Sequence, residues 1–89
     1  MVQQFGSSFR IYRRKQVQAE SGYSRSTIYL RISQGLFPKP VLLGTRAVGW
    51  PAGEVTALNA ARIAGMTDVE IRALVVRLAA ARLIAADAI

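Results

Sequence analysis

The sequence predicts a small, mainly helical domain of 89 residues with one β-hairpin and an added C-terminal helix. Two observations support this prediction. Glycines end three segments with helical patterns, at Gly22, Gly35 and Gly65, and glycine is favoured just past a helix C-terminus. Between the second and third of these segments, Pro38 and Pro40 exclude a helix, and short β-prone runs follow them.

The first half of the chain predicts two short helices separated by a tight turn. One helix covers residues 13–21 and the other covers residues 25–34. Ser24 precedes the second helix as an N-cap, because its hydroxyl can accept a hydrogen bond from a free backbone amide. Two short helices joined by about three residues that include a glycine form a helix-turn-helix. Residues 1–9 carry little pattern, and we expect them to be loose.

The second helix is predicted to bind the core through one side only. Ile28 and Ile32 lie four residues apart on one face, which we assign to the core with Leu36 just beyond it. The other sides of this helix are more polar than expected for a chain in which 52% of residues are hydrophobic. They carry Arg25, Ser26, Thr27, Tyr29, Leu30, Arg31 and Ser33.

A hairpin is predicted next, from Val41–Leu43 and Ala47–Trp50 about a turn at residues 44–46. This ribbon would place Arg46 near its tip. We assign the side chain of Trp50 to the core.

A third helix is predicted over residues 51–64. Pro51 suits its first turn, and Val55 and Leu58 would point inward. Residues 10–64 then form one domain, and residues 65–89 form the added helix.

This C-terminal helix is predicted to run to about residue 86. Thr67 and Glu70 form a capping box, and Asp68 and Arg72 form an acid–base pair at i, i+4. The helix carries two apolar stripes, and a domain of about 55 residues cannot easily bury both. One stripe comprises Ile71, Leu74, Val75 and Leu78, and the other comprises Val69, Val76, Ala80 and Leu83. We expect self-association, as a symmetric dimer or as a head-to-tail array along DNA, through Ile71, Leu74, Val75, Leu78 and Leu83.

The excess positive charge lies entirely in the first half of the chain. Residues 1–50 hold eight basic groups and one acid, whereas residues 51–89 hold four of each, so the first half carries the whole net charge of +7. Such a surface suits a polyanion, above all nucleic acid. A surface kept basic for solubility is the alternative.

The residue types present argue against several other functions. Without histidine or cysteine, the chain has no imidazole or thiolate metal site and no histidine-based triad. We therefore expect no enzyme, no metal and no cofactor. No apolar run reaches the roughly 18 residues that cross a bilayer, and the N-terminus lacks the pattern of a signal peptide. We expect a cytoplasmic, nucleoid-associated protein with neither a membrane nor a small molecule as partner.

A helix-turn-helix followed by a hairpin and a third helix is a winged helix-turn-helix, which usually reads duplex DNA. Arg25 and Arg31 on the second helix can reach guanine edges or phosphates in the major groove, and Arg46 suits the minor groove. The alternative for each is an exposed side chain without a partner. The other candidate DNA contacts are Ser26, Thr27, Tyr29, Leu30, Lys39 and Thr45, with Arg13, Arg14 and Lys15 as backbone contacts.

The segment SRSTIY, followed by GLFPKPVLLGTRAVGWPAGEV, resembles the AlpA family of small phage-type regulators and excisionase-like proteins, whose DNA-binding domain is similar to that of MerR. The resemblance covers about residues 11–64 and implies a DNA-binding winged helix-turn-helix. It carries the recognition positions over to Arg25, Ser26, Thr27 and Tyr29, and the wing arginine to Arg46. Members often place arginine directly after the tyrosine, whereas this chain has Leu30, which suits a thymine methyl.

The leading hypothesis is a protein that binds double-stranded DNA sequence-specifically as the excisionase, or recombination directionality factor, of an integrated mobile element. Regulation of transcription would be its second activity, and a tyrosine-type integrase is a candidate partner. A plain transcriptional regulator of the same family is the alternative. A protein-binding adaptor is a more distant one.

Overall fold

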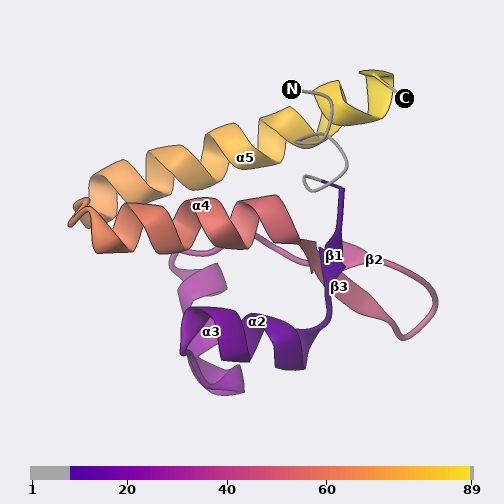
Figure 1. Ribbon diagram of the computed structural model, residues 1–89, viewed down its shortest axis with the longest axis horizontal. Coiled ribbons are helices and arrows are strands. Elements are labelled where there is room, and N and C mark those ends of the chain that lie inside the picture. Colours follow the sequence, from indigo (N-terminus) through magenta and orange to yellow (C-terminus); the bar gives the residue numbers. More distant parts are fainter. Residues whose placement is uncertain (1–8, 89) are drawn as a thin grey trace.

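The computed structural model describes residues 9–88, so the expectation for residues 1–9 lies outside the described residues except at Phe9. Figure 1 shows a winged helix-turn-helix with an added C-terminal helix, which confirms the predicted fold. The elements are β1 (Ile11–Tyr12), α2 (Arg14–Ser21), α3 (Arg25–Ser33), β2 (Val41–Leu42), β3 (Val48–Pro51), α4 (Ala52–Ile63) and α5 (Asp68–Ala88).

The helix-turn-helix consists of α2 and α3, and its turn is fixed by local chemistry. Gly22 has a φ of 77°, a left-handed conformation that glycine adopts without steric cost. Ser24 is the N-cap of α3, as predicted, because its Oγ accepts from the Thr27 amide at 3.2 Å. Ile28 is fully buried, and Ile32 is partly buried against the core. The face assigned to the core is therefore confirmed.

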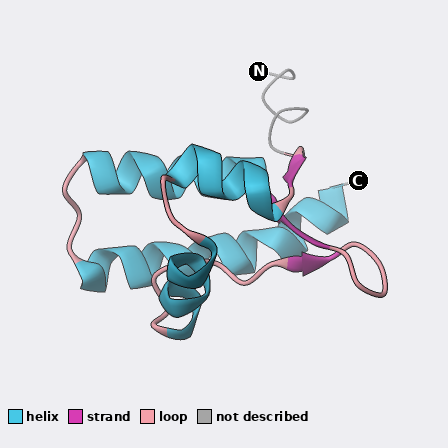
Figure 2. Cartoon of the chain, turned by 90° about the horizontal axis from the view of Figure 1, so that it is seen from below, coloured by secondary structure: helices cyan, strands magenta, loops and turns pink. Residues whose placement is uncertain are grey.

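The wing consists of β2, β3 and the exposed loop between them, as predicted. Val41 lies opposite Gly49 and Leu42 opposite Val48 in the antiparallel pair. Figure 2 shows this loop projecting from the body of the molecule, beyond the short strands.

A third strand was not predicted. The two residues of β1 pair with the other edge of β3, Ile11 opposite Pro51 and Tyr12 opposite Trp50, which gives the strand order β1-β3-β2. A Cβ at Gly49 would lie 2.5 Å from Cγ2 of Ile11, so only glycine allows this close approach.

Trp50 occupies the centre of the core, as predicted. It is fully buried, and its Nε1 donates to the Pro38 carbonyl at 2.9 Å. It belongs to a buried apolar cluster to which every helix contributes: Val17, Ile28, Leu36, Phe37, Trp50, Val55, Leu58, Ala61 and Ile71.

The predicted capping box at the start of α5 is confirmed. The Thr67 amide donates to Oε1 of Glu70 at 2.8 Å, and the Glu70 amide donates to Oγ1 of Thr67 at 3.2 Å. The predicted Asp68–Arg72 pair is wrong, because Nε of Arg72 donates instead to the Gln34 carbonyl at 2.8 Å. That bond ties α5 to the end of α3.

The assignment of the two α5 stripes also needs correction. Helix α5 lies along α4 (Figure 1) and contributes side chains to the core. Ile71 is fully buried there, and Leu74, Val75 and Leu78 pack partly buried against the cluster. These four residues therefore bind the chain's own core rather than a second copy. The outward stripe contains Val69, Val76 and Leu83, which are 75%, 68% and 74% exposed.

Across the described residues, no helix has both the length and the apolar character needed to span a membrane.

Candidate nucleic-acid interface

A basic groove forms where α2, α3 and the wing meet. It encloses about 580 Å³, and its described lining contains no carboxylate. The N-cap and first turn of α2 contribute three cations, α3 contributes a cation and an aromatic ring, and the wing contributes a cation from its loop. The lining residues are Arg13, Arg14, Lys15, Arg25, Tyr29, Arg46 and Val48. Five separate positive charges from three elements thus converge on one hollow, which suits the backbone of a polyanion.

Arg25 is held in this groove by a stack of rings that begins in the core. Its guanidinium carbon lies 5.9 Å from the centroid of the Tyr29 ring, within the range of a cation–π contact. The Tyr29 ring in turn packs edge-on against Trp50, with centroids 6.3 Å apart. Tyr29 is 40% exposed, so its inner edge touches the core while the rest borders the groove. Arg25 is consequently oriented before any ligand arrives.

The hydroxyls at the start of α3 are partly engaged with one another. Oγ of Ser24 donates to Oγ1 of Thr27 at 2.9 Å and lies 3.3 Å from Oγ of Ser26. Thr27 is half-buried, whereas Ser26 is exposed. Ser26 is therefore the more accessible of the two predicted hydroxyl donors.

Four predicted contacts on α3 lie outside the groove lining, namely Ser26, Thr27, Leu30 and Arg31. Arg31 turns back toward the helix-turn-helix turn, where its guanidinium carbon lies 5.5 Å from the centroid of the Tyr23 ring. It is half-buried, so the structure separates it from Arg25. Leu30 is 55% exposed and presents an apolar surface on α3.

Arg13 has a structural contact that the sequence did not predict. Its Nε donates to the Val48 carbonyl at 3.0 Å, which joins the start of α2 to strand β3 of the wing. Arg14 donates from Nη1 to Oε1 of Gln18 at 3.2 Å, and Lys15 is exposed. Thr45, in the wing loop beside Arg46, is also exposed.

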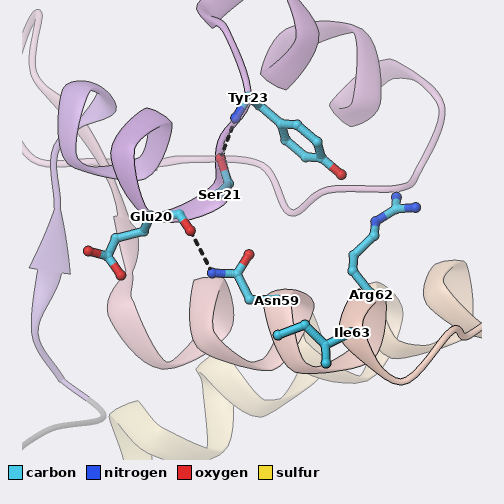
Figure 3. Close-up of a pocket in the computed structure, with 6 residues that line it drawn as sticks. All are labelled: Glu20, Ser21, Tyr23, Asn59, Arg62 and Ile63. Atoms are coloured by element: carbon cyan, nitrogen blue, oxygen red, sulfur yellow. Dashed lines mark hydrogen bonds between the residues drawn. The ribbon is translucent and has the colours of Figure 1, made fainter.

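A second hollow of about 420 Å³ lies at the other end of α2 (Figure 3). Nδ2 of Asn59 donates to the Glu20 carbonyl at 2.9 Å, which ties the end of α2 to α4. Oγ of Ser21 donates to the Val17 carbonyl and accepts from the Tyr23 amide. Most of the polar groups in this hollow thus hold the helix-turn-helix in place.

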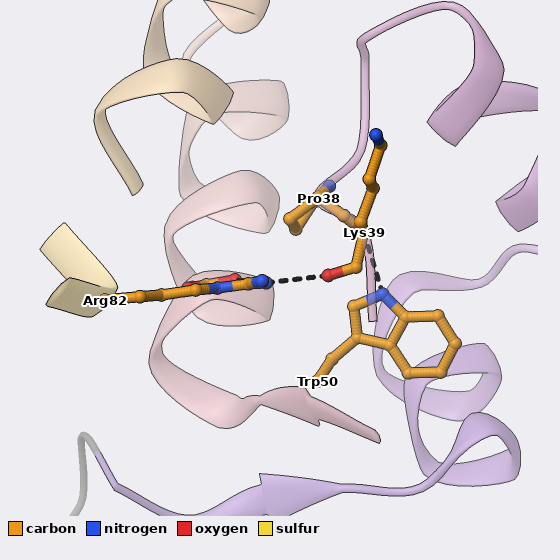
Figure 4. A network of polar contacts seen from close by, with 5 residues as sticks. Pro38, Lys39, Trp50 and Arg82 are labelled. Carbon is orange, nitrogen blue, oxygen red and sulfur yellow. Dashed lines mark hydrogen bonds and ion pairs between the residues drawn. The ribbon is translucent and has the colours of Figure 1, made fainter. Parts of the chain in front are cut away.

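Lys39 lies in the segment that connects α3 to the wing, and its backbone is held by α5 (Figure 4). Nη2 of Arg82 donates to the Lys39 carbonyl at 2.7 Å. The same guanidinium binds both carboxylate oxygens of Glu54, at 2.8 and 2.6 Å. The hydrogen bond with Glu54 raises the pKa of Arg82 above its ordinary value. No sequence signal predicts this pair, because its members are neither close in sequence nor part of a recognisable motif.

The fold and the groove together define a winged helix-turn-helix with a basic face. The sequence pattern of the family described as "Prophage CP4-57 regulatory protein (AlpA)" matches residues 10–63. The chain therefore belongs to this family of phage-type DNA-binding regulators.

The chain is 50% identical, over 56 residues, to the uncharacterized protein ORF88 of Enterobacteria phage P4. The matched segment covers 63% of this chain and 64% of the relative, so the chain spans less than two thirds of the length of that relative. No solved structure matches the chain.

Proposed function

We propose that this protein binds double-stranded DNA sequence-specifically, with α3 in the major groove and the wing beside the minor groove. The observation that carries the proposal is the convergence of Arg25, Arg46 and the α2 cations on one groove. An α-helix fits the major groove, and an arginine at a wing tip fits the negative potential of a narrow minor groove.

In this arrangement the residues of α3 divide between bases and phosphates. Arg25 reads a guanine edge, because it is oriented by Tyr29 and can donate two parallel hydrogen bonds. Ser26 donates to a phosphate or a base, and Leu30 meets a thymine methyl. Arg31 and Thr27 contact phosphates at most, since both are partly engaged within the protein.

The backbone contacts come from the elements around α3. Arg13, Arg14 and Lys15 at the start of α2 line the groove and face one strand of the DNA. Lys39, which is exposed outside the groove lining, reaches a phosphate from the linker before the wing. Thr45 supports Arg46 from the neighbouring position in the wing loop. These contacts supply affinity that falls with salt, but no sequence information.

For the biological role, we propose a recombination directionality factor of an integrated mobile element that also regulates transcription. The support is the family, described by a prophage regulatory protein, and the phage P4 relative. A tyrosine-type integrase is the proposed partner. A plain transcriptional regulator without a recombination role is the second candidate, and the family description favours it equally.

We also propose that the protein self-associates through the outer face of α5. Val69, Val76 and Leu83 recur every seven residues on this face, with Ala73 and Ala80 between them. Apolar residues spaced alternately four and three apart form the seam of a coiled coil. We therefore expect this face to pack against the same face of a second copy of the chain. This assignment keeps Leu83 from the sequence prediction and replaces the other four residues.

DNase footprinting on the protein's own promoter and on the nearest attachment site tests the role. Several evenly spaced protected sites beside the recombination core are expected for a directionality factor. Protection of a single operator at the promoter, with none at the attachment site, would leave only the regulator. Absence of protection on both fragments, and of binding to bulk duplex DNA, would reject DNA binding and favour a protein-binding adaptor.

A further inference from the structure

The segment between α3 and the wing is held by two side chains from distant parts of the chain. Trp50 Nε1 donates to the Pro38 carbonyl at 2.9 Å, and Arg82 Nη2 donates to the next carbonyl, that of Lys39, at 2.7 Å. Lys39 also stands between two prolines, whose rings fix φ on either side. The backbone of Lys39 therefore has little freedom (Figure 4).

Arg82 is itself held rigidly. Its Nε and Nη2 bind the two oxygens of Glu54, whose side chain is 8% exposed, in the two-pronged geometry that suits a guanidinium. Glu54 lies on α4, inside the segment that matches the family. Arg82 lies on α5, which is outside that segment. The C-terminal helix thus reaches past α4 to the linker that leads into the wing.

The side chain of Lys39 is free to act, because it makes none of these contacts. It is exposed, and in Figure 4 its ammonium group points away from Arg82. Only the carbonyl of Lys39 is engaged by α5. The backbone of Lys39 is therefore anchored, while its ammonium group is available to bind a ligand.

We propose that Arg82 is a positioning residue for DNA binding, which fixes the linker backbone so that Lys39 meets a phosphate. The inference rests on the proposed function, since it assumes that Lys39 contacts DNA. It assigns to α5 a role in binding that is separate from self-association.

The test uses a fluorescently labelled duplex of arbitrary sequence, because a phosphate contact does not depend on sequence. Binding is measured at several salt concentrations for the native chain, Lys39→Gln, the double variant Glu54→Gln/Arg82→Gln, and the combination of all three. The double variant removes one charge of each sign, so the net charge stays at +7 and long-range attraction is unchanged. Replacing both members also avoids leaving Glu54 charged and unpaired.

Lys39→Gln is expected to weaken binding and to lower the salt slope by about 0.9, the value for one lost phosphate contact. The double variant is expected to show the same decrease in salt slope as Lys39→Gln. Adding Lys39→Gln to the double variant should then weaken binding by less than a further twofold. Arg77→Gln, an exposed arginine on the same helix, is the control that removes a charge without touching the linker. Thermal melting monitored by circular dichroism verifies that each variant is folded at the assay temperature.

Two results would overturn the inference while the proposed function stands. One is that Lys39→Gln weakens binding as much in the double-variant background as in the native chain. Lys39 would then reach its phosphate without help from Arg82. The other is no effect of Lys39→Gln alone while Arg25→Ala still weakens binding. If the native chain itself fails to bind duplex DNA, the proposed function is wrong.

Discussion

Arg25 takes its position from Tyr29, one turn along its own helix, and Tyr29 is in turn anchored in the core of the protein. Its guanidinium packs on Tyr29, and Tyr29 packs on Trp50, which is fully buried. An arginine held in this way loses less conformational entropy on binding than a free one. This is why a contact at the protein surface depends on an aromatic residue in the interior.

Arg25→Ala is expected to cost about 1–3 kcal/mol on the preferred duplex and to relax specificity at one base pair, because a guanine contact is lost. Fluorescence anisotropy with the preferred duplex and with single-base variants measures both effects. Arg31→Ala on the same helix is the control for specificity: Arg31 lies over Tyr23 and outside the groove lining, and it contacts a phosphate at most, so any loss should be the same on every duplex. An equal loss on every duplex would mean that Arg25 contacts only a phosphate.

Arg82 and Arg62 are both partly buried, but they differ in their hydrogen-bond partners. Arg82→Met leaves the carboxylate of Glu54 buried and unpaired, so we expect it to lower the free energy of unfolding by about 3 kcal/mol. Arg62→Met is its control. Nη2 of Arg62 is buried and has no hydrogen-bond partner among residues 9–88, so we expect a change within about 0.5 kcal/mol. Urea denaturation measures both variants, and equal losses would contradict the comparison.

At the scale of the elements, the helices were predictable because their ends are set by local chemistry. These ends depend on contacts between residues only a few positions apart, as at Ser24, Gly22 and the Thr67–Glu70 box. The local sequence is therefore enough to predict where each helix begins or ends. Strand β1 was not predictable. Its two residues are too few for a pattern, and they become a strand only because β3, about 40 residues later, offers an edge.

The capping box of α5 makes a pH-dependent contribution. Hydrogen bonds from the Thr67 amide and, to a lesser extent, its hydroxyl hold the pKa of Glu70 below its ordinary value of 4.5. A carboxyl whose pKa is lower in the folded state stabilises that state while ionised. Its contribution is therefore complete above pH 4.5 and is lost as the pH falls below that value.

Melting temperatures of the native chain and of Glu70→Gln, compared across this pH range, measure that contribution. The native chain is expected to be more stable at neutral pH, and the difference should shrink as the pH falls through 4.5 and below. Asp68→Asn serves as the control, because it removes a neighbouring charge and leaves the capping bonds intact. A difference that does not change with pH would show that Glu70 acts through something other than its charge.

At the scale of the whole molecule, α5 belongs to the same core as the helix-turn-helix. The sequence predicted two apolar stripes on this helix, but both contain valine and leucine, so composition could not decide which one docks. Two contacts determine which stripe docks. Ile71 is fully buried in the core, and Arg82 binds Glu54, which lies 28 residues earlier in the chain. Most of the basic groove was predictable from residue types, whereas the contact of Arg13 with β3 was not.

Val76→Glu on the outer stripe is expected to abolish self-association without lowering the melting temperature. Val76 is 68% exposed at the middle of the seam, so a charge there disrupts contact with a second copy but not the fold. Sedimentation equilibrium over a range of concentrations, with and without duplex DNA, measures the assembly. Ala81→Glu, also exposed but away from the seam, is the matched control. A native chain that sediments as a monomer throughout would remove the proposed self-association.

The position of Trp50 has an optical consequence. It is the sole tryptophan of the chain, it is shielded from water, and it touches both the tyrosine of α3 and the linker to the wing. Its emission therefore reports unfolding when water reaches the indole ring. Because Tyr29 borders the basic groove, the same emission should respond when DNA occupies that groove. The protein carries its own fluorescent reporter, and binding can be followed without attaching a dye to a basic surface that a label would perturb.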